Sequence, residues 1–429
     1  MRYKKSRILI FFLSLPLMFL VSFGDKTAHR IQPVDFLYVG AFILPDDETV
    51  SYIKSWNYGG HSMTYYPDGD PDGPDDGYPG SIFATGHAWE HQISEIDIPV
   101  PVVSETKKLG DLNTAKTLQS FEDIIDVGDL EIPRTGLAYL PPQGSQRTPK
   151  LYFCWGFHMQ DGPPNLTHGW CELDLSHPEI QRGWYLAGLP SYIQNMSTND
   201  YMCEIPSDWA DANTPGMRLA TGRFRDGGWS GQGPALFAIG PWNQGNPPPF
   251  GAALQNVPLI LYSSTYVYDS DDHIMDDYHH SDEWSGVSWI TAGSKSAVIF
   301  IGTKGFGDCW YGNPDGPCMD CEDRGWWSDE FSGQVIFYDT YELAEVAAGL
   351  KQPWEPQPYA SLEIDNYLFN VTSNQKKYHV NACCFDPMRR LLYIFEHRAD
   401  GDKPLIHVWK VNSDSDSFLE RSKKGAVRR

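Results

Sequence analysis

The amino-acid sequence predicts an all-β protein, more specifically a five-bladed β-propeller, and three observations point to this fold class. A phrase of three strands recurs five times along the chain. The composition includes 39 Gly and 32 Pro with 14% aromatic residues, which is typical of short strands joined by turns. A further strand candidate, at 35–44, precedes the first repeat and has no neighbouring partner in the sequence. Six blades, or a two-sheet sandwich with a second domain, are the alternatives.

Each repeat contains an inner strand, an apolar second strand that ends in a polar residue, and a third strand of alternating pattern. The inner strands are expected at GGHSMTYY (59–66), TGLAYL (135–140), DYMCEI (200–205), GVSWIT (286–291) and HVNACCF (379–385). The second strands are expected at 81–87, 150–158, 217–224, 297–304 and 390–397. Outer strands are expected at 117–121, 184–188, 258–264 and 359–364. Repeats of roughly 55–75 residues with four strands each are typical of propeller blades.

The two ends of the chain complete the predicted ring. The fifth repeat has no strand after Val411, and the segment 35–44 would fill that place and remove the exposed sheet edge. One helix is expected at 340–353, capped by Thr340 and ended by Gly349.

The N-terminus and the charge indicate an exported protein. Residues 1–24 combine a basic start, an apolar run and small residues at the end, as signal peptides do. The chain carries 33 Lys and Arg against 56 Asp and Glu, a formal net charge of −23, which argues against nucleic acid and membrane surfaces as partners. We therefore expect a secreted or periplasmic monomer, a propeller domain at 35–411, a disordered tail at 412–429, and a glycan or small molecule as ligand.

The repeat predicts which distant residues meet at the propeller axis, because second strands end on the face where inner strands begin. The second strands end at His87, His158, Arg223, Lys304 and His397, with Glu396 next to the last. The inner strands begin near His61, Arg134, Asp200, Glu283 and His379. The alternative is that these polar strand ends only reach solvent or satisfy buried backbone groups.

This convergent set supports three hypotheses about function. The first is a carbohydrate-active enzyme, a hydrolase or lyase, that cleaves glycosidic bonds in an axial pocket. Its expected catalytic residues are His87, His158, Arg223, Asp226, Glu283, Lys304, His379 and His397, with Asp200 and Asp282 as further carboxylates. The second is a propeller that binds a glycan or other ligand without catalysis. The third is an enzyme with a transition metal such as zinc, iron or manganese, held by His61, His87, His158, His379 and His397.

Two further patterns suggest a metal site and crosslinks. Asp68, Asp70, Asp72, Gly73 and Asp76 match the oxygen-ligand spacing of a structural calcium loop, although Pro79 replaces the final Glu. Eight Cys in an exported chain predict disulfides. Cys154 and Cys171 could pair, and Cys309, Cys318 and Cys321 would form a disulfide or, given the CxxC spacing, a zinc site.

Three segments resemble a group of exported bacterial proteins with no assigned activity. They are YVGAFILPD (38–46), GSIFATGH (80–87) and GLKQPWEPQPYA (349–360). The resemblance covers most of the chain after residue 24. It implies a single-domain propeller and bacterial export, and it implies nothing about chemistry.

Overall fold

The computed structural model describes the protein over most of its length. The described residues are 27–46, 54–70, 73–125, 134–156, 166–188, 198–224, 231–240, 248–264, 272–312, 325–373 and 377–413.

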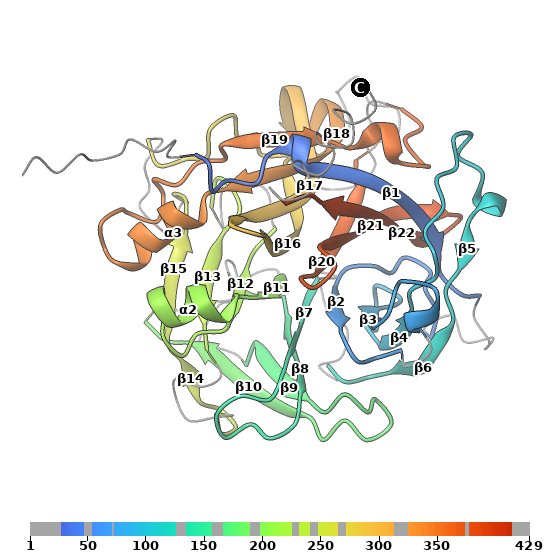
Figure 1. Ribbon diagram of the computed structural model, residues 1–429. Helices are drawn as coiled ribbons and strands as arrows, with labels where there is room; N and C mark the ends of the chain where they lie inside the picture. Colours follow the sequence, from blue (N-terminus) through green and yellow to red (C-terminus); the bar gives the residue numbers. More distant parts are fainter. Residues whose placement is uncertain are drawn as a thin grey trace, which may run out of the picture.

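Five sheets, antiparallel except for the short edge strands β5 and β14, stand around one axis and form a five-bladed β-propeller, as the sequence predicts (Figure 1). The first blade is β2 (Met63–Tyr66), β3 (Ser81–Thr85), β4 (Ile93–Asp97) and β6 (Thr117–Glu122). The second is β7 (Thr135–Leu140), β8 (Lys150–Trp155), β9 (His168–Cys171), β10 (Gln181–Leu186) and the short β14 (Ala253–Leu254). The third is β11 (Tyr201–Glu204), β12 (Leu219–Gly222), β13 (Leu236–Ile239) and β15 (Asn256–Ile260).

The last two blades contain the longest strands. The fourth is β16 (Glu283–Ala292), β17 (Lys295–Tyr311), β18 (Trp326–Tyr338) and β19 (Ala360–Glu363). The fifth is β20 (Val380–Asp386), β21 (Leu391–Asp400), β22 (Lys403–Val411), β1 (Phe36–Ile43) and the short β5 (Asn113–Thr114). The inner strands β2, β7, β11, β16 and β20 each contact the next, and β20 contacts β2, which closes the ring.

The N-terminal strand closes the fifth blade, so the predicted ring closure is confirmed. β1 runs antiparallel to β22, with Phe36 opposite Val411 and Ile43 opposite Leu405. The Tyr38 hydroxyl lies 2.9 Å from Nδ1 of His407, which joins the two strands through their side chains.

The core lies between neighbouring blades, where apolar faces of adjacent sheets pack together. Tyr201 of the third blade contacts Phe300 of the fourth at 5.8 Å between ring centroids, and both are buried. Tyr65 of the first blade stacks on Tyr393 of the fifth, with 11° between the ring planes. Alternate residues of each strand face opposite blades, so every sheet contributes to two of these interfaces.

Several local expectations need correction. The predicted helix is α3 (Thr340–Ala347), but the side chain of Asp339, which accepts from Tyr341 N at 2.9 Å, provides its cap. The second helix, α2 (Ser207–Asn213), was not predicted, because its composition does not differ from that of a loop. Within the described ranges, no helix is long and apolar enough to cross a bilayer.

The expected Cys154–Cys171 disulfide does not form. β8 and β9 pair with Cys154 opposite His168 and Leu151 opposite Cys171, so the two thiols are out of register. All six described cysteines are free: Cys154, Cys171, Cys203, Cys309, Cys383 and Cys384. Cys318 and Cys321 lie outside the described residues.

Candidate functional site

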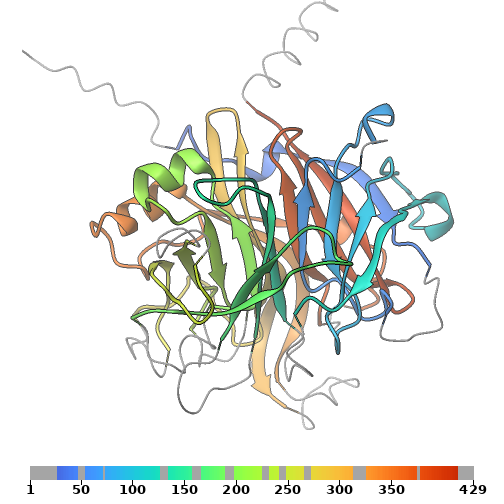
Figure 2. The same ribbon diagram turned by 90° about the horizontal axis from the view of Figure 1, so that it is seen from below.

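The propeller axis has two ends of different character. All five inner strands start at one end, which we call the polar end: it is the region around His61, Arg134, Asp200, Glu283 and Lys377. The inner strands finish at the opposite end, where α2 lies, and we call this the cavity end. Figure 2 shows the ring from the side. The sequence pointed to the polar end only.

Arg134, just before β7, is at the centre of the polar end. Its Nη1 lies 2.6 Å from Nδ1 of His61, and its Nη2 lies 3.4 Å from Oε2 of Glu283. The Phe224 ring stacks on the guanidinium at 4.1 Å. Nε2 of His61 is 3.0 Å from the carbonyl oxygen of Tyr58 and donates to it. Burial, together with the charge of Arg134, holds the pKa of His61 well below its usual value, so this imidazole is neutral.

Two carboxylates at the polar end are already paired with cations. Oε1 of Glu283 lies 3.1 Å from Nζ of Lys377, so this carboxylate bridges Lys377 and Arg134. Oδ2 of Asp200 lies 3.5 Å from Nε of Arg223, and both side chains are fully buried. Buried ion pairs repay little of their desolvation cost, so these pairs are weak contributors to stability. Stability therefore does not explain why these buried ion pairs occur together at the polar end.

Lys304 belongs to a separate buried network beside the fourth blade. Its Nζ lies 3.2 Å from Oδ1 of Asp282 and 2.8 Å from Nδ1 of His279. Asp282 also accepts from the backbone N–H of Gly305 at 2.9 Å. Burial raises the pKa of Asp282 to about 6, although Lys304 opposes the shift. These contacts compensate the buried charge of Lys304. The Nζ of Lys304 is therefore paired with Asp282 and His279, and it does not belong to the group around Arg134.

The other predicted histidines lie at the same end in separate positions. Nδ1 of His379 is 2.8 Å from Oδ1 of Asp365, and Nδ1 of His397 is 3.1 Å from Nδ2 of Asn381. His87 follows β3, and burial lowers its pKa. The charges of His91 and His397 both lower the pKa of His61, so these two rings lie near it, whereas His379 pairs with Asp365. His158 and Asp226 lie outside the described residues.

His91 is the polar-end residue that the sequence did not single out. It is buried, and neither ring nitrogen has a hydrogen-bond partner among the described residues. Its ring meets the ring of His61 edge-on at 6.0 Å between centroids. Nε of Arg134 also has no partner in the described structure. Burial, with the charge of Arg134, lowers the pKa of His91 to about 3. Three buried polar atoms around His61 therefore have no partner within the described ranges, and unpaired buried polar atoms are costly and rare in native proteins.

Four of the eight described non-glycine residues with positive φ lie at the same end. Tyr58, His91, Tyr378 and Arg398 have φ values of 56°, 48°, 66° and 50°, in the left-handed region that bulky residues avoid. Tyr58 and Tyr378 precede an inner strand, and His91 follows a second strand. Arg398 lies near the end of the second strand β21. Strained residues of this kind persist where the surrounding structure forces them, and they gather at functional sites.

The two metal sites expected from the sequence include residues outside the described ranges, namely Asp72 and His158. Among the described residues, no group of three or more His, Cys, Asp or Glu could hold a metal ion. His61 uses both ring nitrogens for hydrogen bonds. Of the calcium loop, Asp76 accepts from Tyr78 N at 2.8 Å, and Asp72 lies outside the described residues. Both metals remain predictions.

The channel narrows between its two ends. At the waist, the described walls enclose about 10 Å³, close to the lower limit for one water molecule. Ser62 Oγ and Thr135 Oγ1 are 3.0 Å apart there. A Cβ added at Gly136 would lie 2.5 Å from Met202 N, so only glycine lets these inner strands come so close. The polar end is thus separated from the cavity beyond it.

Comparisons with known proteins add no function. No family model matches the chain, and no curated protein matches it. A solved structure of similar shape is the holo form of the pyranose dehydrogenase PQQ domain from Coprinopsis cinerea, with 9% sequence identity and a TM-score of 0.36. That match covers 85% of this chain and 98% of the other. The class that the fold defines is the five-bladed β-propeller.

Proposed function

We propose that the polar end is the active site of an enzyme that cleaves an acidic glycan by β-elimination. The observation that carries this proposal is a group of buried atoms around His61 with no hydrogen-bond partner among the described residues, namely Nε of Arg134 and both ring nitrogens of His91. A substrate carboxylate would accept a hydrogen bond from Nε of Arg134, in the charge-assisted geometry that arginine favours. The strained φ of 48° at His91 supports a functional role for the same residue.

Elimination fits these residues better than hydrolysis does. A glycoside hydrolase needs one protonated and one ionised carboxyl group. Here Glu283 lies between Arg134 and Lys377, at 3.4 and 3.1 Å, and Asp200 faces Arg223, so neither carboxyl group is placed as a proton donor. A lyase instead needs a cation to neutralise the uronate and a base to take a proton, and both groups are present.

The proposed step assigns one role to each residue. The proton on the carbon beside the substrate carboxylate passes to His91. The electron pair of that carbon–hydrogen bond forms a carbon–carbon double bond, and the carbon–oxygen bond to the leaving sugar breaks. The released oxygen takes a proton from water, and His91 later returns its own proton to solvent. Because an anion beside an imidazole favours the protonated form, substrate binding would raise the low pKa of His91 as the step proceeds.

The test is a panel of polyuronates, followed by the ultraviolet absorbance of the double bond that elimination creates. We expect His91→Asn to lose activity about a hundredfold or more, the usual contribution of a general base. Asn tolerates the left-handed backbone that His91 adopts, so the fold should survive. His168→Asn is the matched control, because His168 is a buried histidine of the second blade that bonds to Thr167 and Thr221.

Three results would count against the proposal. His91→Asn with full activity would remove the assigned base. Cleavage without a double bond would indicate hydrolysis. Tight binding of a polyuronate with no cleavage would favour a propeller that binds glycans without catalysis, which is the second candidate function.

A further inference from the structure

A cavity of about 300 Å³ opens at the cavity end, where the five inner strands finish. Each inner strand contributes to it, and the turns after β2, β11 and β20 form its rim. Its volume is at the lower end of the range for small-molecule sites, about 300–1,000 Å³. The waist described above separates it from the polar end. This cavity is therefore a second site, independent of the proposed reaction.

Sulfur is concentrated in the lining of this cavity. Six of its 21 lining residues carry sulfur, against 8 Cys and 10 Met in 429 residues overall. They are Met63, Met202, Met388, Cys203, Cys383 and Cys384. Thioether and thiol groups are polarisable and make favourable contacts with aromatic rings. Burial raises the pKa of the Cys203 thiol to about 12, so it is a neutral, apolar wall rather than a nucleophile.

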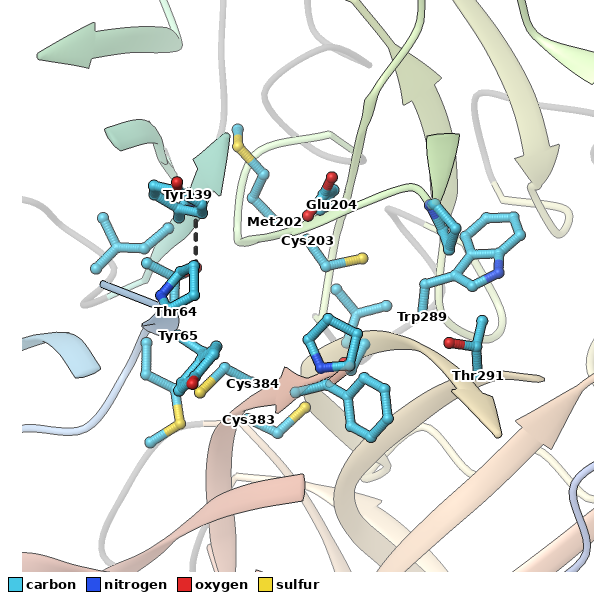
Figure 3. A pocket seen from close by; sticks show the side chains of 18 of the residues that line it. Thr64, Tyr65, Tyr139, Met202, Cys203, Glu204, Trp289, Thr291, Cys383 and Cys384 are labelled. Atoms are coloured by element: carbon cyan, nitrogen blue, oxygen red, sulfur yellow. Dashed lines mark hydrogen bonds between the residues drawn. The ribbon is translucent and has the colours of Figure 1, made fainter. Parts of the chain in front are cut away.

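Aromatic side chains complete the walls. Figure 3 shows Tyr65 and Tyr139 on one side of the cavity and Trp289 on the other. Trp289 is held in place by Trp209, at 4.5 Å between ring centroids. Tyr139 N donates to Thr64 Oγ1 at 2.9 Å, which fixes the first wall. Two opposed walls of aromatic and sulfur groups suit a flat ring between them.

The polar groups of the lining offer one charged acceptor and no available cation. The guanidinium of Arg218 already donates three hydrogen bonds. Nη2 donates to Oε1 of Glu204 at 2.7 Å, Nη1 to Oε1 of Gln143 at 2.6 Å, and Nε to the carbonyl oxygen of Ile205 at 3.2 Å. Oε2 of Glu204 has no protein partner in the described structure, and 37% of the side chain is exposed. An anionic ligand would meet this carboxylate without a cation to pair with.

We infer that the cavity end binds a small planar aromatic or heteroaromatic molecule with one N–H or ammonium group directed at Glu204. The ring would lie between Trp289 and the wall of Tyr65 and Tyr139. The ligand's donor would complete the hydrogen bonding of Oε2. One or two fused rings match the volume of the cavity.

The test uses three probes that share one ring system: indole, the cationic tryptamine and the anionic indoleacetate. Isothermal titration calorimetry on the full chain should show binding in the order tryptamine, indole, indoleacetate. Glu204→Gln should weaken tryptamine about tenfold, the effect of losing one charge-assisted hydrogen bond, and leave indole unchanged. Thr291→Trp, which fills the cavity from the end of β16, should abolish binding of both.

Controls separate this site from the rest of the protein. Glu172→Gln alters an ion pair with Lys150 outside the cavity and should change no affinity. His91→Asn, at the polar end, should also leave tryptamine binding intact. The inference is overturned if no probe binds, if indoleacetate binds as tightly as tryptamine, or if Thr291→Trp binds normally. A stoichiometric soft metal that is lost in Cys383→Ser but kept in Cys171→Ser would overturn it as well.

Discussion

Replacing Glu283 by Met should destabilise the protein strongly, because it would leave Arg134 and Lys377 facing each other without the carboxylate between them. The two cationic side chains are only 7% and 3% exposed, and their distances to Glu283 are 3.4 and 3.1 Å. Removing one partner of a buried ion pair costs about 3–5 kcal/mol, since it leaves uncompensated buried charge.

Replacing all three residues by Met should largely restore stability. A buried charged triad exchanged for apolar side chains of similar size is often neutral or stabilising, by about 1–4 kcal/mol. Urea unfolding, followed by circular dichroism, gives the comparison from the shift of the midpoint at a common slope. Glu172→Met is the control: its partner is Lys150, but the carboxylate side chain is 28% exposed, so a cost of about 1 kcal/mol or less is expected.

The triple variant shows whether the charges of Arg134, Glu283 and Lys377 serve stability or function. If it folds at least as well as the wild type but has no activity on polyuronates, the charges are retained for function. A triple variant as unstable as Glu283→Met would refute this reasoning, because the triad would then be a net contributor to stability.

Three further predictions concern other parts of the molecule. The pKa of Asp282 in the folded protein is about 6, above its ordinary value of 3.8. The free energy of unfolding should therefore fall as the pH rises between these two values. Asp282→Asn should flatten this pH dependence, measured by urea unfolding at a series of pH values. Tyr38→Phe removes the hydroxyl that pairs with His407 and should cost about 1 kcal/mol, measured by thermal unfolding. Calcium should raise the melting temperature if the loop at 67–80 binds it, and the rise should vanish in Asp70→Asn; an unchanged melting temperature in calcium would contradict the calcium prediction.

The fold could be predicted because each blade repeats the same physical pattern. The alternation of the inner strands and the apolar runs of the second strands recur at similar spacing, so β2, β7, β11, β16 and β20 all appear near their predicted positions. The positions of His61, Arg134 and Glu283 followed from that alignment. The blade alignment alone predicts that these three residues lie close together.

Other parts of the site depend on features that a single sequence does not display. His91 lies in the loop after β3, and neither its φ of 48° nor its unpaired nitrogens can be deduced from HAWEH (87–91). Lys377 could have been found, since it precedes β20 as Arg134 precedes β7. The cavity was missed because Met202 and Cys383 have the pattern of ordinary core residues, and only the ring geometry turns them toward a common space.

The pairing of β1 with β22 determines how the molecule would respond to a pulling force. Because the strands are antiparallel and Phe36 is opposite Val411, the chain enters β1 and leaves β22 at the same end of this strand pair. A load applied between the ends would first release Arg30 and Ile31 from the fourth blade. It would then open the β1–β22 hydrogen bonds one after another instead of shearing them together. The fifth blade would therefore separate at low force while the other four still held their shape, and the ring would open at its seam.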